Sequence, residues 1–286
     1  MQHLDEKLSL DIIAAHFCIS KYHFDRIFKE KTDESVYAFI KRRKVDQSTI
    51  DMKLNPEKVI TDVGLDYGYS ASNYSFVFRK RYDTSPAMFR QSIPTHSMTV
   101  PFAPGRVARF KTAEEYAAQI EVQTLDDLFV LYERFIGNYI ELERKWHRFL
   151  GEYNDFSDEK TIMAEQFFND PVITNPAQCF CDISMIVEAD CDLSNVMWIR
   201  GGQWGVYHFD GEIKDIFEAL QGIFSVWLPQ SGYKMTRRYG LNIYRHIDRS
   251  DHSAVMDLYI PVSYEQEFRR GQAGFLSISE KCFEIL

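Results

Sequence analysis

The sequence contains no apolar run that approaches the ~18–20 residues needed to span a lipid bilayer. Its first residues, MQHLDEKL, lack the apolar segment of a secretory signal, and we therefore expect a cytoplasmic protein with no membrane partner. Cysteine is scarce: the five cysteines are odd in number and widely spread, which favours free thiols over a disulfide framework. These absences exclude a polytopic membrane protein and a small disulfide-rich scaffold.

The sequence also lacks the short motifs that carry common chemistry. It has no phosphate-binding P-loop, no G-x-S-x-G nucleophile elbow and no H-E-x-x-H metal motif. Cys179 and Cys181 are only one residue apart, which is too close for the usual spacing of zinc ligands and fits alternate residues of one strand. We therefore expect no catalytic residues, no metal and no cofactor.

What the chain does contain is enough apolar and aromatic material for packed cores. Its 286 residues are 45% hydrophobic and 15% aromatic, a length that favours two domains. Residues 1–93 carry 15 basic and 13 acidic residues, a balance of +2, whereas residues 94–286 carry 18 basic and 29 acidic residues, a balance of −11. This asymmetry suits a nucleic-acid-binding domain joined to an acidic domain, although two unrelated domains would also show it.

The segment 59–91 has the pattern of a helix-turn-helix. It reads as a short helix, a turn at Gly68–Tyr69, a helix over 71–82 capped by Ser70, and a third helix that opens at Ser85–Pro86. A second helix with polar and basic residues is typical of one that enters the DNA major groove. An αα-hairpin of an ordinary helical domain would give the same pattern.

The same pattern occurs earlier in the chain, which favours the DNA-binding interpretation. Apolar residues at helical spacing predict a helix over 10–17, followed by a turn at Cys18–Ile19 and a Ser20-capped helix over 21–31 with Phe24, Ile27 and Phe28 inward. FKEKTDES at 28–35 is repeated as FRKRYDTS at 78–85. A Ser35-capped helix over 36–54 would span ~27 Å between the units, close to the ~34 Å between successive major grooves.

These residues resemble the AraC/XylS-type DNA-binding domain over 4–91, in the segments LSLDIIAAHFCISKYHFDRIFKEK, IKRRK and VITDVGLDYGYSASNYSFVFRKRYDTSPAMFR. The resemblance implies two helix-turn-helix units joined by a linker helix, in a bacterial transcription regulator that contacts double-stranded promoter DNA and RNA polymerase. Carried over residue by residue, it implies base contacts by Tyr22, Asp25, Arg26, Ala71, Ser72, Ser75 and Phe76. Phosphate contacts are expected from basic residues at Lys21, Lys29, Lys41, Arg42, Arg43, Arg79, Lys80 and Arg81.

The chain departs from this family at several positions. Cys18 stands where members usually have Gly, at a turn that would strain any other residue if its φ is positive. Phe76 stands where the family commonly has Arg, so base reading there should be apolar or absent. The second recognition helix is one residue shorter at its start, and the family's first helix begins before Met1. We therefore expect a weakly supported first unit and a second unit that dominates DNA affinity.

The remaining chain contains a second internal repeat. Prolines and Gly105 predict a linker over 94–108. Beyond it, FVLYERFIGNYIELERKWHRFLGEY at 129–153 parallels WGVYHFDGEIKDIFEALQGIFSVWL at 204–228, each a strand, a turn and an amphipathic helix. Strand-like segments follow at 179–188 in the first half and at 240–247 and 254–262 in the second. Two strand-helix-strand-strand halves predict a pseudo-two-fold α+β domain with a cleft between them.

This half resembles the GyrI-like effector-binding domain over roughly 118–263, in the segments CFCD, GGQWGVYHFDGE, WLPQSGY, GLNIY and DLYIPV. The resemblance implies that small aromatic or cationic molecules bind in the central cleft. Many such domains carry a Glu where this chain has Asn242, so we expect a small aromatic or weakly polar effector, or none. We interpret Trp204, Asn242 and Tyr244 as ligand-binding residues, although either aromatic side chain can equally belong to the core.

The sequence thus predicts a multidomain chain: an all-α double helix-turn-helix domain over 1–93, a linker over 94–108, and an α+β pseudo-two-fold domain over 109–286. We expect a one-component regulator, in the order DNA reader first and effector domain second. Two alternatives stay open for the second domain. It can be a protein-interaction module without a small ligand, or a hydrolase of small molecules.

Overall fold

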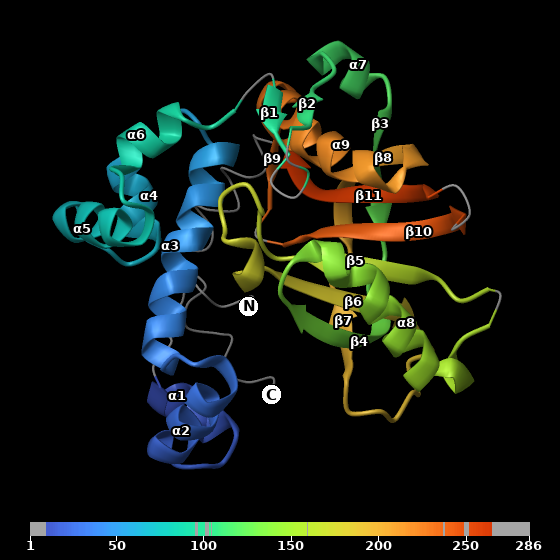
Figure 1. Cartoon of the computed structure of the whole chain (residues 1–286), viewed down its shortest axis with the longest axis horizontal. Helices are drawn as coiled ribbons and strands as arrows, with labels where there is room; N and C mark the ends of the chain where they lie inside the picture. Colours follow the sequence, from blue (N-terminus) through green and yellow to red (C-terminus); the bar gives the residue numbers. More distant parts are fainter. Residues whose placement is uncertain are drawn as a thin grey trace. The chain divides into compact units, whose positions relative to one another are not determined.

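The computed structural model describes residues 10–94, 97–100, 103, 105–158, 160–236, 238–248 and 252–264. The chain divides into two compact units at Ile93 and Pro94 (Figure 1). The first unit is helical, and the second is built on a large antiparallel sheet. The described helices include none that is both long and apolar enough to cross a membrane.

The first unit consists of two short-helix groups at opposite ends of one long helix, α3 (Figure 1). Its described helices are α1 (Leu10–His16), α2 (Lys21–Thr32), α3 (Val36–Leu54), α4 (Ile60–Asp66), α5 (Ala71–Tyr82) and α6 (Pro86–Gln91). The predicted bounds of α3 and α5 are confirmed to the residue. The reason is local, because α2, α3, α5 and α6 each begin after a serine whose side chain accepts a hydrogen bond from a backbone N–H of the first turn.

Both turns of the double helix-turn-helix use a left-handed residue. Cys18 has φ 54° and Gly68 has φ 80°, so the condition under which a side chain at position 18 is strained is met. The same hydrogen bonds close the two preceding helices: Ile19 N donates to Ala14 O over 3.2 Å, and Tyr69 N donates to Gly64 O over 2.9 Å. The repeat seen in the sequence is therefore a repeat of backbone geometry.

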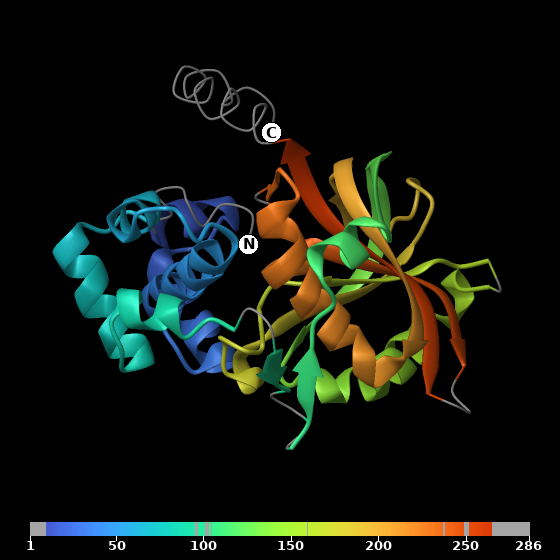
Figure 2. The same cartoon turned by 90° about the horizontal axis from the view of Figure 1, so that it is seen from above.

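The second unit is organised by an antiparallel sheet whose described strands run in the order β3-β8-β11-β10-β5-β6-β4-β7, with β9 pairing β11 (Figures 1 and 2). The strands are β3 (Ile120–Leu125), β4 (Leu128–Ile136), β5 (Met163–Phe167), β6 (Phe180–Ile186), β7 (Val196–Ile199), β8 (Gly202–Glu212), β9 (Tyr233–Met235), β10 (Gly240–Asp248) and β11 (Ser253–Tyr264). The helices in this unit are α7 (Ala113–Ala117), α8 (Leu142–Glu152), α9 (Ile216–Gly222) and α10 (Leu228–Gln230), with a π-helical turn over Ile223–Trp227.

The strand order confirms the predicted pseudo-two-fold arrangement. The first half is β4, α8, β5 and β6, and the second is β8, α9, β10 and β11. Within the sheet the two halves follow one another in opposite order: β8, β11 and β10 of the second half correspond to β4, β6 and β5 of the first. The halves meet where β10 pairs with β5. At this junction Asn242 lies directly opposite Glu165. The strand that carries Glu165 has no counterpart among the strands predicted from the sequence.

The stretch predicted as a linker contains two paired strands, β1 (Ser97–Thr99) and β2 (Val107–Arg109). Met98, Val100 and Ala108 pack with Phe217 of α9 in one apolar cluster. The Arg106 guanidinium also pairs with Asp215 and Glu218 at the start of α9. Much of this stretch is therefore a hairpin that belongs to the second unit.

Candidate functional site

The second recognition helix, α5, has clearly separated faces. It buries Tyr74, Val77 and Phe78 in a cluster with α3 and α4 residues. Apart from Arg81, the predicted base-contacting and phosphate-contacting residues of this helix lie on the exposed side: Ala71, Ser72, Ser75, Phe76, Arg79 and Lys80. Phe76 is 67% exposed, which is high for a phenyl ring on a helix that has an apolar core beneath it. The exposed side therefore combines short polar side chains, one aromatic ring and two cations.

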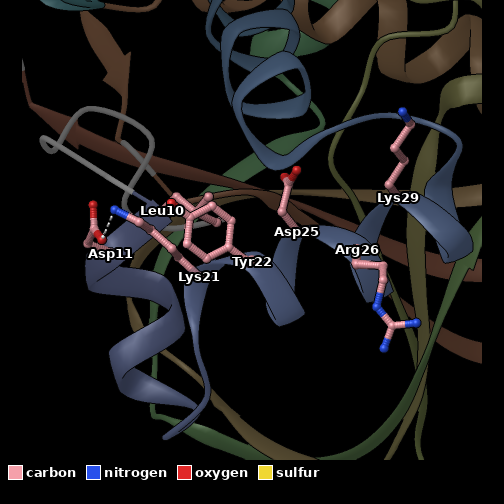
Figure 3. A pocket seen from close by; sticks show the side chains of 7 residues that line it. All are labelled: Leu10, Asp11, Lys21, Tyr22, Asp25, Arg26 and Lys29. Atoms are coloured by element: carbon pink, nitrogen blue, oxygen red, sulfur yellow. Dashed lines mark ion pairs between the residues drawn. The ribbon is translucent and has the colours of Figure 1, made fainter.

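The first recognition helix, α2, presents Tyr22, Arg26 and Lys29 outward, and Tyr22 is 79% exposed. These side chains line a pocket together with Leu10, Asp11, Lys21 and Asp25 (Figure 3). Lys21 forms an ion pair with Asp11 at 3.0 Å, and this partner raises the pKa of the Lys21 ammonium. Arg26 contacts Glu30 at 3.2 Å on the surface, a pair weak enough to give way to a guanine or a phosphate.

Asp25 differs from the other predicted base-reading residues because it has a partner inside the domain. Its Oδ1 accepts a hydrogen bond of 2.9 Å from the backbone N–H of Val36, the first residue of α3. In the second helix-turn-helix the equivalent residues are Ser75 and Pro86, and Pro86 has no backbone N–H that needs a hydrogen-bond acceptor. Asp25 therefore joins α2 to α3, whereas Ser75 is exposed and uncommitted to such a cap.

Three of the arginines predicted to contact phosphates are instead buried in the helical unit or paired with its acidic residues. Arg43 is fully buried, so the structure does not support its prediction as a phosphate contact. Arg42 pairs with Glu34, and Arg81 pairs with Asp46 at 2.9 Å. Burial acts against the charge on Arg81, but the Asp46 carboxylate outweighs it and raises the arginine's pKa. The exposed basic residues of α5 are thus Arg79 and Lys80.

In the sheet-containing unit that begins at Pro94, the buried polar residues gather where β5 meets β10. Glu165 is 3% exposed, and its Oε1 accepts a hydrogen bond of 2.6 Å from Trp146 Nε1 on α8. Burial raises the pKa of this carboxyl group, while hydrogen bonds from Trp146 and Tyr244 act in the opposite direction. The Tyr244 ring stands edge-on to Trp146, with ring centroids 6.0 Å apart. Tyr244 and Asn242 therefore lie at the same site as Glu165.

Asn242 is buried directly across from Glu165, and a hydrogen bond from its side chain also acts to lower the pKa of that carboxyl group. Trp204 lies elsewhere. It is fully buried in an apolar cluster with Val206 and Leu241, and the Arg238 guanidinium sits 4.5 Å from its ring centroid. A ligand cannot stack on a ring that is enclosed in this way, so the structure does not support Trp204 as a ligand-binding residue.

Sequence reasoning missed Glu165 and Trp146. The signal that would have found them is the internal repeat. Each half needs a strand after its helix, and among the described residues the strand between α8 and β6 is β5, at 163–167. In the structure that strand pairs with β10, and Glu165 lies directly opposite Asn242. The carboxylate absent at position 242 is thus present on the neighbouring strand.

Comparison with known proteins agrees with this architecture. The GyrI-like small molecule binding domain matches residues 118–263, just over half of the chain, and a helix-turn-helix domain matches residues 13–92. The right origin-binding protein of Escherichia coli (strain K12) is 24% identical over 270 residues, which cover 88% of this chain and 89% of that protein.

Two further similarities span one or both units. The transcriptional regulator Rob of Salmonella typhimurium is 22% identical over 267 residues, 87% of this chain and 88% of that protein. The crystal structure of the EcmrR C-terminal domain is 13% identical, covers 51% of this chain and 98% of that chain, and has a TM-score of 0.43. This chain belongs to the AraC-type helix-turn-helix transcription regulators that carry a C-terminal GyrI-like small molecule binding domain.

Proposed function

We propose that this regulator binds promoter DNA mainly through its second helix-turn-helix unit and senses its effector at the buried Glu165 carboxylate. The first part rests on packing. Helix α5 buries its own Tyr74, Val77 and Phe78 against residues of α3 and α4, and an ion pair between Arg81 and Asp46 joins it to α3. In the first helix-turn-helix, by contrast, the aromatic side chain of Phe17 is 59% exposed and covers less of a core. A recognition helix held rigidly loses less conformational freedom on binding DNA.

The effector site rests on one observation, a buried carboxylate that no Lys or Arg side chain pairs with among the described residues. A buried charge without an opposite charge is costly, and a cationic or strongly hydrogen-bonding ligand would supply what is missing. Trp146 and Tyr244 add aromatic surface beside it. We therefore propose an aromatic effector that carries a cation or an N–H donor, in place of the neutral effector expected from Asn242 alone.

Regulation follows if the effector binds one state of the protein better than another, because only differential affinity shifts an equilibrium. We place the output in contacts between the DNA-bound regulator and RNA polymerase. The second domain acts as a sensor in this proposal, without catalysis. A promoter-specific transcription assay with purified polymerase, with and without effector, measures this output directly.

The effector site is tested by calorimetry on the full chain with two matched probes, tetraphenylphosphonium and the neutral triphenylphosphine oxide. We expect the wild type to bind the cation more tightly, and Glu165→Gln to lose most of that preference. Glu143→Gln, at an exposed glutamate of α8, is the matched control. Equal binding of the cation by Glu165→Gln and wild type would contradict the site. If no aromatic compound binds, the second domain is better explained as a protein-interaction module.

The same variant has an expected effect on stability. The pKa of Glu165 is raised above its ordinary value of 4.5 in the folded protein, so the charged form opposes folding. Stability should therefore fall as the pH rises through the interval above 4.5, and Glu165→Gln should remove that part of the pH dependence. At neutral pH the variant without ligand should melt at a higher temperature than the wild type. A lower melting temperature would mean that the carboxylate has a stabilising partner.

A further inference from the structure

Phe76 is the feature of the DNA-binding unit that its fold does not explain. It occupies the exposed side of α5 together with Ser72, Ser75 and Arg79, all within one helical turn of it. The core beneath the helix is already formed by Tyr74, Val77 and Phe78. No ring contact to Phe76 occurs among the described residues, and two of its neighbours on this face are short serines. The phenyl ring therefore projects from the helix into solvent.

The equivalent helix of the first unit shows what such a position is for. Aligning Ser20 with Ser70 places Tyr22 at the position of Ser72, and Arg26 at that of Phe76. The aromatic and the hydrogen-bonding positions are thus interchanged between the two recognition helices, one turn apart. Arg26 has the paired donors that suit guanine O6 and N7. Phe76 has neither donor nor acceptor, so it cannot read a base by hydrogen bonds.

The major groove displays one apolar feature that identifies a base, the C5 methyl group of thymine. Arg79 and Lys80 lie one turn further along the exposed side of α5 and are placed to hold phosphates, which position the helix without reading sequence. We propose that Phe76 packs on a thymine methyl group in the half-site under the second unit. The operator would then be asymmetric in chemistry, with guanine specified by Arg26 in one half-site and thymine by Phe76 in the other.

This inference rests on the proposed DNA-binding function and is tested by changing the DNA. An operator is first selected from random duplexes with the full chain. Each thymine in it is then replaced by uracil, which removes only the C5 methyl group. One replacement in the half-site of the second unit should weaken wild-type binding about four-fold, the equivalent of ~0.8 kcal/mol for one buried methyl group. Fluorescence anisotropy with labelled duplexes measures this loss.

Protein variants assign the loss to Phe76. Phe76→Ala should bind the thymine and uracil duplexes equally, and Phe76→Leu should retain part of the difference. Phe76→Arg should prefer guanine at the same position. Met88→Ala, at an exposed apolar residue of α6, is the control that should keep the full thymine preference. Because Phe76 is exposed, these variants should fold, and circular dichroism melts verify that they do.

The outcomes separate the two claims. If selection enriches no sequence and no duplex binds, the proposed DNA-binding function fails. If an operator binds but uracil has no effect at any position under the second unit, the inference about Phe76 is overturned. It is also overturned if Phe76→Ala keeps the same thymine preference as the wild type.

Discussion

The two helix-turn-helix units share a backbone but differ in how tightly they are packed. In the second unit, Gly64 allows Tyr74 to approach so closely that a Cβ at position 64 would lie 2.8 Å from the ring. The equivalent residue in the first helix-turn-helix is Ala14, which carries the Cβ that position 64 lacks. Val77 is buried in the second unit, whereas the equivalent Ile27 is 38% exposed. Repetition of caps and turns therefore preserves the shape, while side-chain packing decides which unit is rigid.

The units also differ in how their ends are joined. The Tyr74 hydroxyl donates a hydrogen bond of 2.8 Å to Ser48 Oγ on α3. Asp46, also on α3, accepts hydrogen bonds from Arg81 and from the Tyr82 hydroxyl. The first helix-turn-helix reaches α3 through Asp25 and through the ion pair between Glu34 and Arg42. The second reaches it through the buried Tyr74 hydroxyl and the buried Asp46 carboxylate.

The largest test of this difference is Asp46→Ala. The substitution leaves Arg81 and the Tyr82 hydroxyl without their carboxylate, and it should destabilise the second unit by about 3 kcal/mol. Hydrogen exchange of the α5 amides measures the loss locally. Exchange in α2 should change little, and equal loss of protection in both units would contradict the view that they are packed separately.

Exchanging the small residues at equivalent positions tests the close approach. Gly64→Ala forces a Cβ against the Tyr74 ring and should cost about 2 kcal/mol by overpacking. Ala14→Gly creates no such overlap and should cost about 1 kcal/mol, the usual difference in helix propensity between alanine and glycine. Chemical unfolding of both variants compares the two costs. A larger cost at position 14 would reverse the assignment of the tighter unit.

Replacing Cys18 by glycine should make the units more alike. Cys18 is held at φ 54°, where a side chain is strained and glycine is not. Cys18→Gly should therefore stabilise the first unit by about 1 kcal/mol. The mirror substitution, Gly68→Ala, should destabilise the second unit by a similar amount at φ 80°. Thermal melts that move in the same direction for both variants would contradict this explanation.

The smallest expected effect on DNA recognition concerns Asp25. Asp25→Ala frees the Val36 N–H and should cost about 1 kcal/mol of stability. Base preference should stay unchanged, because the carboxylate is engaged inside the unit. Ser75→Ala serves as the comparison, since the equivalent residue caps nothing. A changed base preference in Asp25→Ala would restore its role as a base-reading residue.

Local signals in the sequence were enough to predict most of the helical unit, which holds both helix-turn-helix motifs. Serine caps, Pro86 and the left-handed turns act over a few residues, so α3 and α5 were predicted to the residue. Lys41, Arg42 and Arg43 were all predicted as phosphate contacts, but α3 is contacted by helices on several sides and Arg43 is buried. Ile27 was predicted inward, and its 38% exposure makes that prediction wrong.

In the sheet-containing unit that begins at Pro94, the internal repeat predicted the two halves but not the site between them. The pairing of β5 with β10 joins residues far apart in the sequence, and no local pattern reports that register. Glu165 was therefore missed although Asn242 and Tyr244 were found. Trp204 was misinterpreted for the same reason, because its enclosure by Val206, Leu241 and Arg238 depends on tertiary packing. The hairpin at 97–109 was hidden by its prolines and glycine, which resemble a linker.

The most direct test of the account compares operator binding by two variants of the full chain. Arg79→Ala/Lys80→Ala removes the exposed cations of the second recognition helix, and Arg26→Ala removes the guanine-reading candidate of the first. We expect the double variant to lose on the order of ten-fold in affinity at physiological salt and Arg26→Ala to lose less. Anisotropy titrations over a range of salt concentrations separate phosphate contacts from base contacts. A larger loss from Arg26→Ala would contradict the dominance of the second unit.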